Sequence, residues 1–135
     1  MRSRAIAALA TAAVSAALAA AASAAMMHPQ LGARLSGMGE HGVANLQITQ
    51  ASGKLCWTLD VPSSLGATLA SIHTGASGPT LLELGMHFSK SGCEKESSMT
   101  LAHLEAKPGS YSVWINTKAH MGELRGTLFA GMAHM

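Results

Sequence analysis

The chain combines imidazole and thioether side chains with very few aromatic rings. It holds seven histidines and nine methionines, against two phenylalanines and one tyrosine. Imidazole nitrogen and thioether sulfur are both copper ligands, and thioethers favour the reduced ion Cu(I). The composition therefore indicates copper handling. The alternative interpretation is that methionine fills gaps in a core with few aromatic side chains, and it applies above all to Met38, Met86 and Met99.

Methionine and histidine also concentrate near the two ends of the chain. Side chains in loose ends are not needed for packing, and the ends of a β-sandwich can lie close together. We therefore hypothesise a copper site formed by the two termini, with His73 or His120 as a further ligand. The candidate metal ligands are Met26, Met27, His28, His73, His120, Met121, Met132, His134 and Met135.

The first residues are typical of a secretory signal peptide. Arg2 and Arg4 precede an alanine-rich apolar run, and small residues follow it at the spacing that signal peptidase requires. Cleavage after Ala24 and cleavage after Ala25 both fit this rule. The run is also about as long as a membrane span, so an uncleaved anchor is the alternative. With cleavage, we expect a periplasmic or secreted protein.

The position of the cut matters for copper. Cleavage after Ala25 would place His28 third in the mature chain. The amine, two backbone amide nitrogens and the imidazole then form a square-planar site suited to Cu(II). Cleavage after Ala24 would place the histidine fourth and weaken that geometry.

The rest of the chain is long enough for one small domain. We expect a signal peptide at 1–24, a flexible start at 25–30, a folded domain at 31–130 and a flexible tail at 131–135. The chain has nine basic and seven acidic residues, and Arg2 and Arg4 leave with the signal. The near-neutral remainder offers no electrostatic footprint for nucleic acid or for strong membrane association.

Two cysteines, Cys56 and Cys93, suggest one disulfide in an exported chain. Closing that loop would stabilise the domain by about 3–4 kcal/mol. Cys56 lies in a strand pattern and Cys93 in what reads as a turn. The alternative is a pair of thiolate metal ligands, as in a copper carrier.

Short alternating segments separated by turns dominate the chain after the signal. Residues 43–49 and 54–61 read as a hairpin across a glycine-containing turn. Residues 87–98 look irregular, and 99–104 fit either a strand or a short helical turn. Further strands are expected at 31–37, 68–73, 80–86, 111–116 and 122–130. We predict an all-β fold, a Greek-key-like antiparallel β-sandwich of about seven to eight strands without a helix of useful length.

The order of several short motifs resembles the CHRD (chordin-type) domain. The motifs are Leu35-Ser36-Gly37, Gly53-Lys54-Leu55-Cys56-Trp57, Ile72-His73-Thr74-Gly75, Gly78-Pro79, Tyr111 to Asn116, and Gly122 to Leu128 with its Arg125-Gly126 pair. The resemblance spans nearly the whole chain after the signal. It implies a β-sandwich and supplies no catalytic activity.

The chain departs from this family at two histidines. The family usually has histidines on both sides of the isoleucine, and Ser71 takes the place of the first. Asn116 stands where a further histidine is expected. If the family histidines bind a metal, this chain has lost two of three ligands. His73 then has two interpretations, a ligand at the sheet end or a structural histidine bonded to the turn at 75–78.

The closing motif also has two interpretations. Arg125 and Glu123 alternate along a strand and can share a face. We expect a buried Arg125 to fix the last strand by binding a carboxylate or loop carbonyls, with Gly78, Pro79 and Gly126 in structural roles. An anion-binding arginine is the alternative.

Three functions follow. The first is an exported binding module without enzymatic activity, whose partner is an unknown protein or metal ligand. The second is a periplasmic copper-binding protein. The third is a superoxide-dismutase-like enzyme, against which Ser71 and the single aspartate, Asp60, both count. No nucleophile elbow, phosphate loop or dinucleotide fingerprint is present in the sequence.

Overall fold

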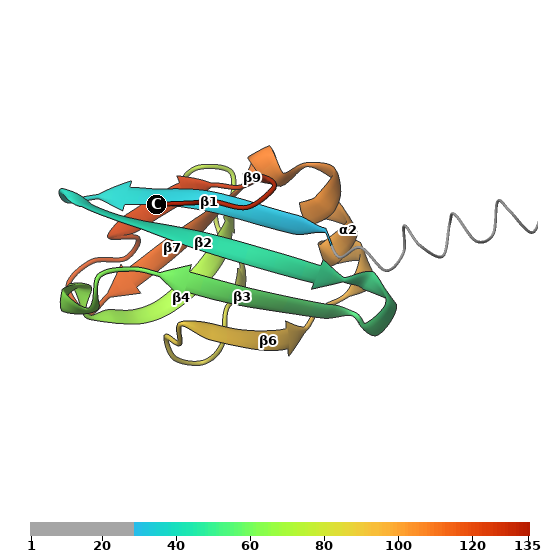
Figure 1. Ribbon diagram of the computed structural model, residues 1–135, viewed down its shortest axis with the longest axis horizontal. Helices are drawn as coiled ribbons and strands as arrows, with labels where there is room; N and C mark the ends of the chain where they lie inside the picture. The colour runs from blue at the N-terminus through green and yellow to red at the C-terminus, as the bar shows by residue number, and fades with distance from the viewer. Residues whose placement is uncertain (1–28) are drawn as a thin grey trace, which may run out of the picture.

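The strands form one continuous antiparallel sheet that curls into two facing layers (Figure 1). The computed structural model describes residues 29–135. In that range the strands are β1 (Gln30–Gly37), β2 (Glu40–Thr49), β3 (Lys54–Asp60), β4 (Ala67–Thr74), β5 (Thr80–Glu83), β6 (Ser91–Lys95), β7 (Tyr111–Thr117), β8 (Leu124–Thr127) and β9 (Phe129–Ala130). Their order is β5-β4-β7-β8-β1-β2-β3-β6, and β9 pairs with β1. The prediction of an all-β antiparallel fold is confirmed.

The hairpin of β2 and β3 follows directly from the sequence. Apolar side chains alternate along both strands, so each strand turns one face inward. Leu46 pairs with Trp57, and both side chains are buried. Between the strands, Gly53 takes a left-handed conformation with φ of 63°, which glycine adopts without steric cost. The predicted hairpin is therefore confirmed.

The core lies between the two layers and is built almost entirely from aliphatic side chains. Its fully buried large members are Leu35, Leu46, Ile48, Leu55, Ile72, Leu84, Leu101, Leu104, Val113, Ile115, Leu124 and Leu128. Each such side chain contributes about 1.5–3 kcal/mol of transfer free energy on burial. Leucine, isoleucine and valine thus supply the volume that the sequence lacks in aromatic rings.

The segment between β5 and β7 differs from the prediction. It contains a strand, β6, where we expected irregular chain at 87–98. Residues 99–104, for which a strand and a short helical turn were the alternatives, lie in the helix α2 (Ser98–Ala106), which is longer than the expected turn. The hydroxyl of Ser97 caps α2 by accepting from the backbone amide of Thr100. Leu101 and Leu104 anchor it in the core. The sequence pattern did not show the full length of the helix, because only these two buried side chains mark its period.

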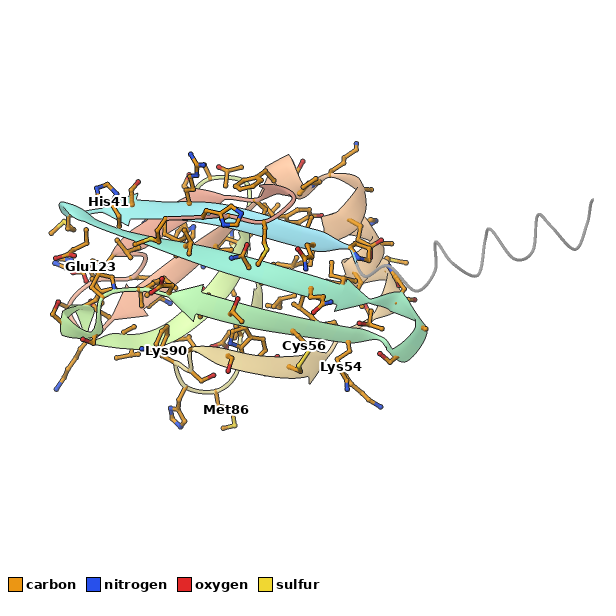
Figure 2. All side chains as sticks on the ribbon, in the orientation of Figure 1. His41, Lys54, Cys56, Met86, Lys90 and Glu123 are labelled. Carbon is orange, nitrogen blue, oxygen red and sulfur yellow. A yellow bond between two sulfur atoms is a disulfide. The ribbon has the colours of Figure 1, made fainter. Side chains whose placement is uncertain are left out.

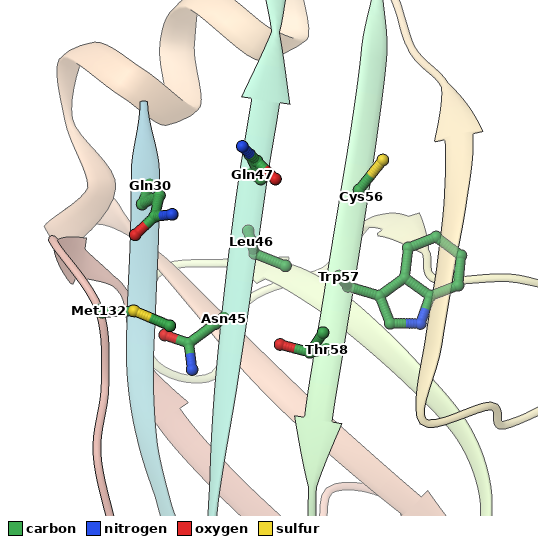
Figure 3. Close-up of a pocket in the computed structure, with 8 residues that line it drawn as sticks. All are labelled: Gln30, Asn45, Leu46, Gln47, Cys56, Trp57, Thr58 and Met132. Carbon is green, nitrogen blue, oxygen red and sulfur yellow. The ribbon is translucent and has the colours of Figure 1, made fainter. Parts of the chain in front are cut away.

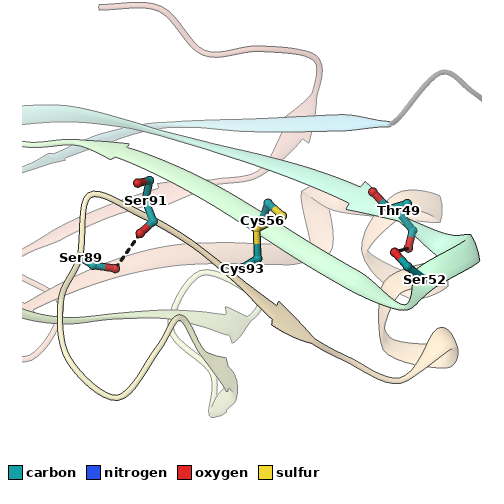
Figure 4. Close-up of a disulfide and its surroundings, with 6 residues drawn as sticks. All are labelled: Thr49, Ser52, Cys56, Ser89, Ser91 and Cys93. Atoms are coloured by element: carbon teal, nitrogen blue, oxygen red, sulfur yellow. Dashed lines mark hydrogen bonds between the residues drawn. A yellow bond between two sulfur atoms is a disulfide. The ribbon is translucent and has the colours of Figure 1, made fainter.

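The disulfide joins two neighbouring strands (Figure 4). Cys56 of β3 and Cys93 of β6 are directly paired in the ladder, 37 residues apart in the chain, which confirms the predicted disulfide. Cys93 lies in a strand rather than in the expected turn. The bond fastens the edge strand β6 to the sheet.

The predicted last strand, 122–130, is divided into β8 and β9. Leu128 lies between them with its side chain in the core, and its amide donates to the carbonyl of Tyr111. This break lets β8 pair with β7 while β9 pairs with β1. Within residues 29–135, no helix is long and apolar enough to cross a membrane.

Candidate metal-binding surface

Every methionine in the part of the chain that the structure describes lies at the surface. Met38, Met86, Met99, Met121, Met132 and Met135 are each more than half exposed. Figure 2 shows Met86, which is 89% exposed, projecting away from the ribbon. The interpretation that Met38, Met86 and Met99 fill gaps in the core is therefore wrong, because aliphatic side chains already pack that core.

The exposed histidines lie close to these methionines. His87, His120 and His134 each adjoin a methionine in sequence. On α2, Met99 and His103 are four residues apart, which puts both side chains on one face of the helix. Among residues 29–135, no three His, Cys, Asp or Glu side chains are grouped as a metal site. Two hollows are instead lined by an imidazole together with a thioether, His120 with Met121 and His134 with Met135.

Met132 lies at β1, next to Asn45 of β2 (Figure 3). It lines a shallow hollow of about 170 Å³ together with Gln30 and Thr58. The next residue, Ala133, is bound at both backbone groups: its amide donates to Oδ1 of Asn45, and its carbonyl accepts from Nδ2. The segment 131–135, for which we expected a flexible tail, is thus attached to β2 at its middle.

His134 and Met135 line a second hollow, next to the first. Arg34 and His41, from β1 and β2, complete its polar lining. His41 was not among the predicted ligands, because nothing in the sequence connects it with residues 134–135. His41 and residues 134–135 lie close together because the hydrogen bonds of Ala133 to Asn45 hold the tail against β2.

His120 and Met121 line a third hollow, at the end of the sandwich that carries the β1–β2 turn. Met38, Glu123 and Arg125 line it as well. The candidate ligands at 120–121 and those at 132–135 therefore lie in different hollows.

Met26, Met27 and His28 lie outside the described residues, so the hypothesis of a site shared by both termini stays a prediction. The chain does enter β1 beside the tail, since the amide of Gly131 donates to the carbonyl of Gln30.

His73 is buried and bonded at both ring nitrogens. Its Nδ1 donates to the carbonyl of Gly78 at 2.9 Å, because a carbonyl oxygen can only accept. In the neutral ring, Nε2 then accepts from the hydroxyl of Ser71, also at 2.9 Å. The side chain is only 3% exposed. The expected contact with the turn is present, and no nitrogen of this ring is left for a metal.

An aromatic stack extends this cluster across three strands. The ring of Trp114 on β7 lies parallel to that of His73, with centroids 3.6 Å apart. Arg125 on β8 lies over Trp114 at 3.7 Å and donates from Nε to the carbonyl of Gly122. The loop-carbonyl partner expected for Arg125 is found, whereas its expected burial is not, since this side chain is exposed.

The small residues of the family motifs act where backbones approach closely. A Cβ on Gly126 would collide with the carbonyl of Arg34, where β8 crosses to β1. A Cβ on Gly78 would collide with the carbonyl of Thr74, to which the Gly78 amide donates. The carbonyl of Pro79 accepts from the amide of Thr74. Gly78 and Pro79 thus shape the turn to which His73 is bonded, and Gly126 allows β8 to lie against β1.

Three residues have roles in the structure that the sequence pattern did not indicate. Trp114 is the centre of the stack, and Asn116 accepts from the amide of Gly122 at 2.6 Å. Met38 lies at the third hollow. The flanking glycines of Met38 were a signal for a tight turn that would expose its side chain.

A scan of protein-family models found no match to this chain, and neither did a search of curated proteins.

Proposed function

We propose that this protein is an exported CHRD-type β-sandwich that acts as a binding module, without enzymatic activity, and whose ligand is copper. One observation carries the proposal: all methionines in residues 29–135 are exposed, and exposed histidines lie beside them. Imidazole and thioether together form a soft ligand set that suits copper.

Exposure of the thioethers matters because it leaves their sulfur atoms accessible to an ion from solution. Met38 and Met121, which are 71% and 70% exposed, contribute nothing to the core that would justify their size. Metal binding supplies a reason for keeping thioethers, rather than polar side chains, at these positions.

The cluster around His73 belongs to the scaffold in this proposal. Its bonds to Ser71 and Gly78 and its stacking on Trp114 satisfy the buried imidazole. Export is supported by the signal-like first residues and by the Cys56–Cys93 disulfide, since disulfides persist in oxidising compartments. A periplasmic or secreted location is thus part of the proposal.

Copper titration of the exported protein tests this function. Protein purified from the periplasm is first weighed by intact mass spectrometry, which gives the mature N-terminus and any bound metal. Cu(I) is then added under ascorbate in competition with a chromophoric chelator, and Cu(II) is added separately. We expect at least one copper site tighter than about 10 µM. No site of that strength for either ion would remove the proposal.

A superoxide assay tests the enzymatic alternative. We expect copper-loaded protein to turn over superoxide no faster than the same amount of copper released from it. Turnover well above that level would replace the binding module with a superoxide-dismutase-like enzyme.

A further inference from the structure

Met38 has a backbone conformation that is unusual for its side chain. In the hairpin of β1 and β2, Gly37 pairs with Glu40, so Met38 and Gly39 form a two-residue loop. Both have positive φ, 54° and 79°, as tight hairpin loops require. Asparagine followed by glycine suits such loops best, yet Met38 is the one non-glycine with positive φ in residues 29–135. Its side chain is 71% exposed, so packing does not explain it.

The loop that carries His120 and Met121 is held at both ends. The amide of His120 donates to Oγ1 of Thr117, and its carbonyl accepts from the amide of Thr117. On the other side, the amide of Gly122 donates to Oδ1 of Asn116. Two adjacent soft ligands therefore project from a backbone whose hydrogen bonds fix it, which lowers the entropy lost on binding an ion.

Backbone contact holds the two loops together. Gly37 packs against the carbonyl of Glu123 so closely that a Cβ there would collide with it. One residue earlier, Ser36 of β1 pairs with Arg125 of β8. Met38, His120 and Met121 consequently line one hollow at this end of the sandwich. In Figure 2, Glu123 and His41 mark the same end.

We infer that Met38, His120 and Met121 form the primary Cu(I) site of this chain. The inference rests on the proposed copper function and specifies its site. Two thioethers and one imidazole are a soft set of low coordination number, which suits Cu(I) better than Cu(II) or Zn²⁺. Glu123 and Arg125 also line the hollow, and the guanidinium of Arg125 is stacked on Trp114. Binding involves no electron transfer, because the ion enters as Cu(I).

Methionine-methyl NMR of the full exported protein identifies the first ligands. The methionines are labelled with ¹³C at the methyl group, and Ag(I), a redox-inert mimic of Cu(I), is added below one equivalent. The variants M38L and M121L assign the two key signals. We expect Met38 and Met121 to shift first. The signal of Met86, in a remote loop, serves as the internal control.

Affinity of the same variants gives the second readout. We expect M38L and M121L each to weaken the tightest Cu(I) site by about tenfold or more, while M86L leaves it unchanged. Leucine is about as large as methionine and is strained to the same degree by the positive φ at position 38. We therefore expect the fold to be preserved, and circular dichroism checks this. X-ray absorption of Cu(I)-loaded protein should show a smaller sulfur contribution in M38L.

The outcomes separate the site from the function. First shifts at Met132 and Met135, with tight Cu(I) binding that M38L and M121L leave unchanged, would overturn this site and preserve the copper proposal. Absence of any copper site tighter than about 10 µM in the unmodified protein would overturn the function itself.

Discussion

His73 and His120 show two opposite uses of the same side chain. His73 is buried, bonded at both ring nitrogens and stacked on Trp114. His120 is exposed, and its fixed backbone presents the imidazole beside Met121 and Met38. In the first region every polar atom of the ring serves the fold, whereas in the second the side chain is accessible to an ion.

The comparison teaches that accessibility, and not residue type, separates structural from chemical histidines in this sheet. A buried polar group is costly unless it is hydrogen-bonded, so the surroundings of His73 are completed by Ser71 and the turn at Gly78. No such requirement acts on His120. Its neighbours are therefore informative about function, and two of them are thioethers.

The largest expected effect comes from substituting the two histidines in parallel. His73→Ala removes the stack and leaves the buried hydroxyl of Ser71 and the carbonyl of Gly78 without their partner. We expect it to lower the free energy of unfolding by about 4 kcal/mol. His120→Ala should change it by less than about 0.5 kcal/mol. Urea denaturation measures both, and equal losses would break the contrast between the two sites.

Removing the disulfide weakens the fold without touching either histidine. The double variant Cys56→Ser/Cys93→Ser should lose about 3–4 kcal/mol, because the unfolded chain is no longer constrained across the 37-residue separation. Thermal unfolding gives the loss. Below the unfolding transition, its tightest Cu(I) affinity should equal that of the unmodified protein. A weaker site would show that copper affinity depends on the disulfide that holds β6, and not only on the side chains of the third hollow.

Met38→Asn separates turn geometry from ligand chemistry. Asparagine tolerates positive φ better than methionine, so we expect a gain of about 1 kcal/mol in stability. Cu(I) affinity should fall at the same time, because one thioether is lost. Chemical denaturation and chelator competition on the same sample measure both. A stable variant with unchanged copper affinity would assign the methionine no role as a ligand.

The smallest expected change in stability is at Glu96, and it depends on pH. Burial, and secondarily the charge of Glu94, raises the pKa of its carboxyl above the usual 4.5. The folded state therefore favours the protonated form, and this contribution to stability is lost as pH rises from about 4.5 through the folded-state pKa. Glu96→Gln should be slightly more stable than the unmodified protein at pH 7 and indistinguishable at pH 3. Urea titrations at both values test the sign.

The strand pattern was predictable from local sequence because the period of two is strong where one face is buried. The β2–β3 hairpin, the disulfide and the contact of His73 with its turn were all anticipated from residues close in sequence or from the cysteine count. The helix α2 was anticipated only as one of two alternatives at 99–104, since only Leu101 and Leu104 mark its buried face. Methionine burial was predicted wrongly because composition does not show which side chains already fill the core.

By itself, the sequence determined the strand alternation, the tight turns and the supply of imidazole and thioether groups, because these depend on neighbouring residues. Only the tertiary structure decided which of those groups meet. The pairing of Ser36 with Arg125 brings Met38 to His120 and Met121, and the bonds of Asn45 to Ala133 bring residues 134–135 to His41. These contacts join residues far apart in the chain, as the 88-residue separation of Asn45 and Ala133 illustrates. Local propensity cannot encode them, because they arise when the sheet closes around its core.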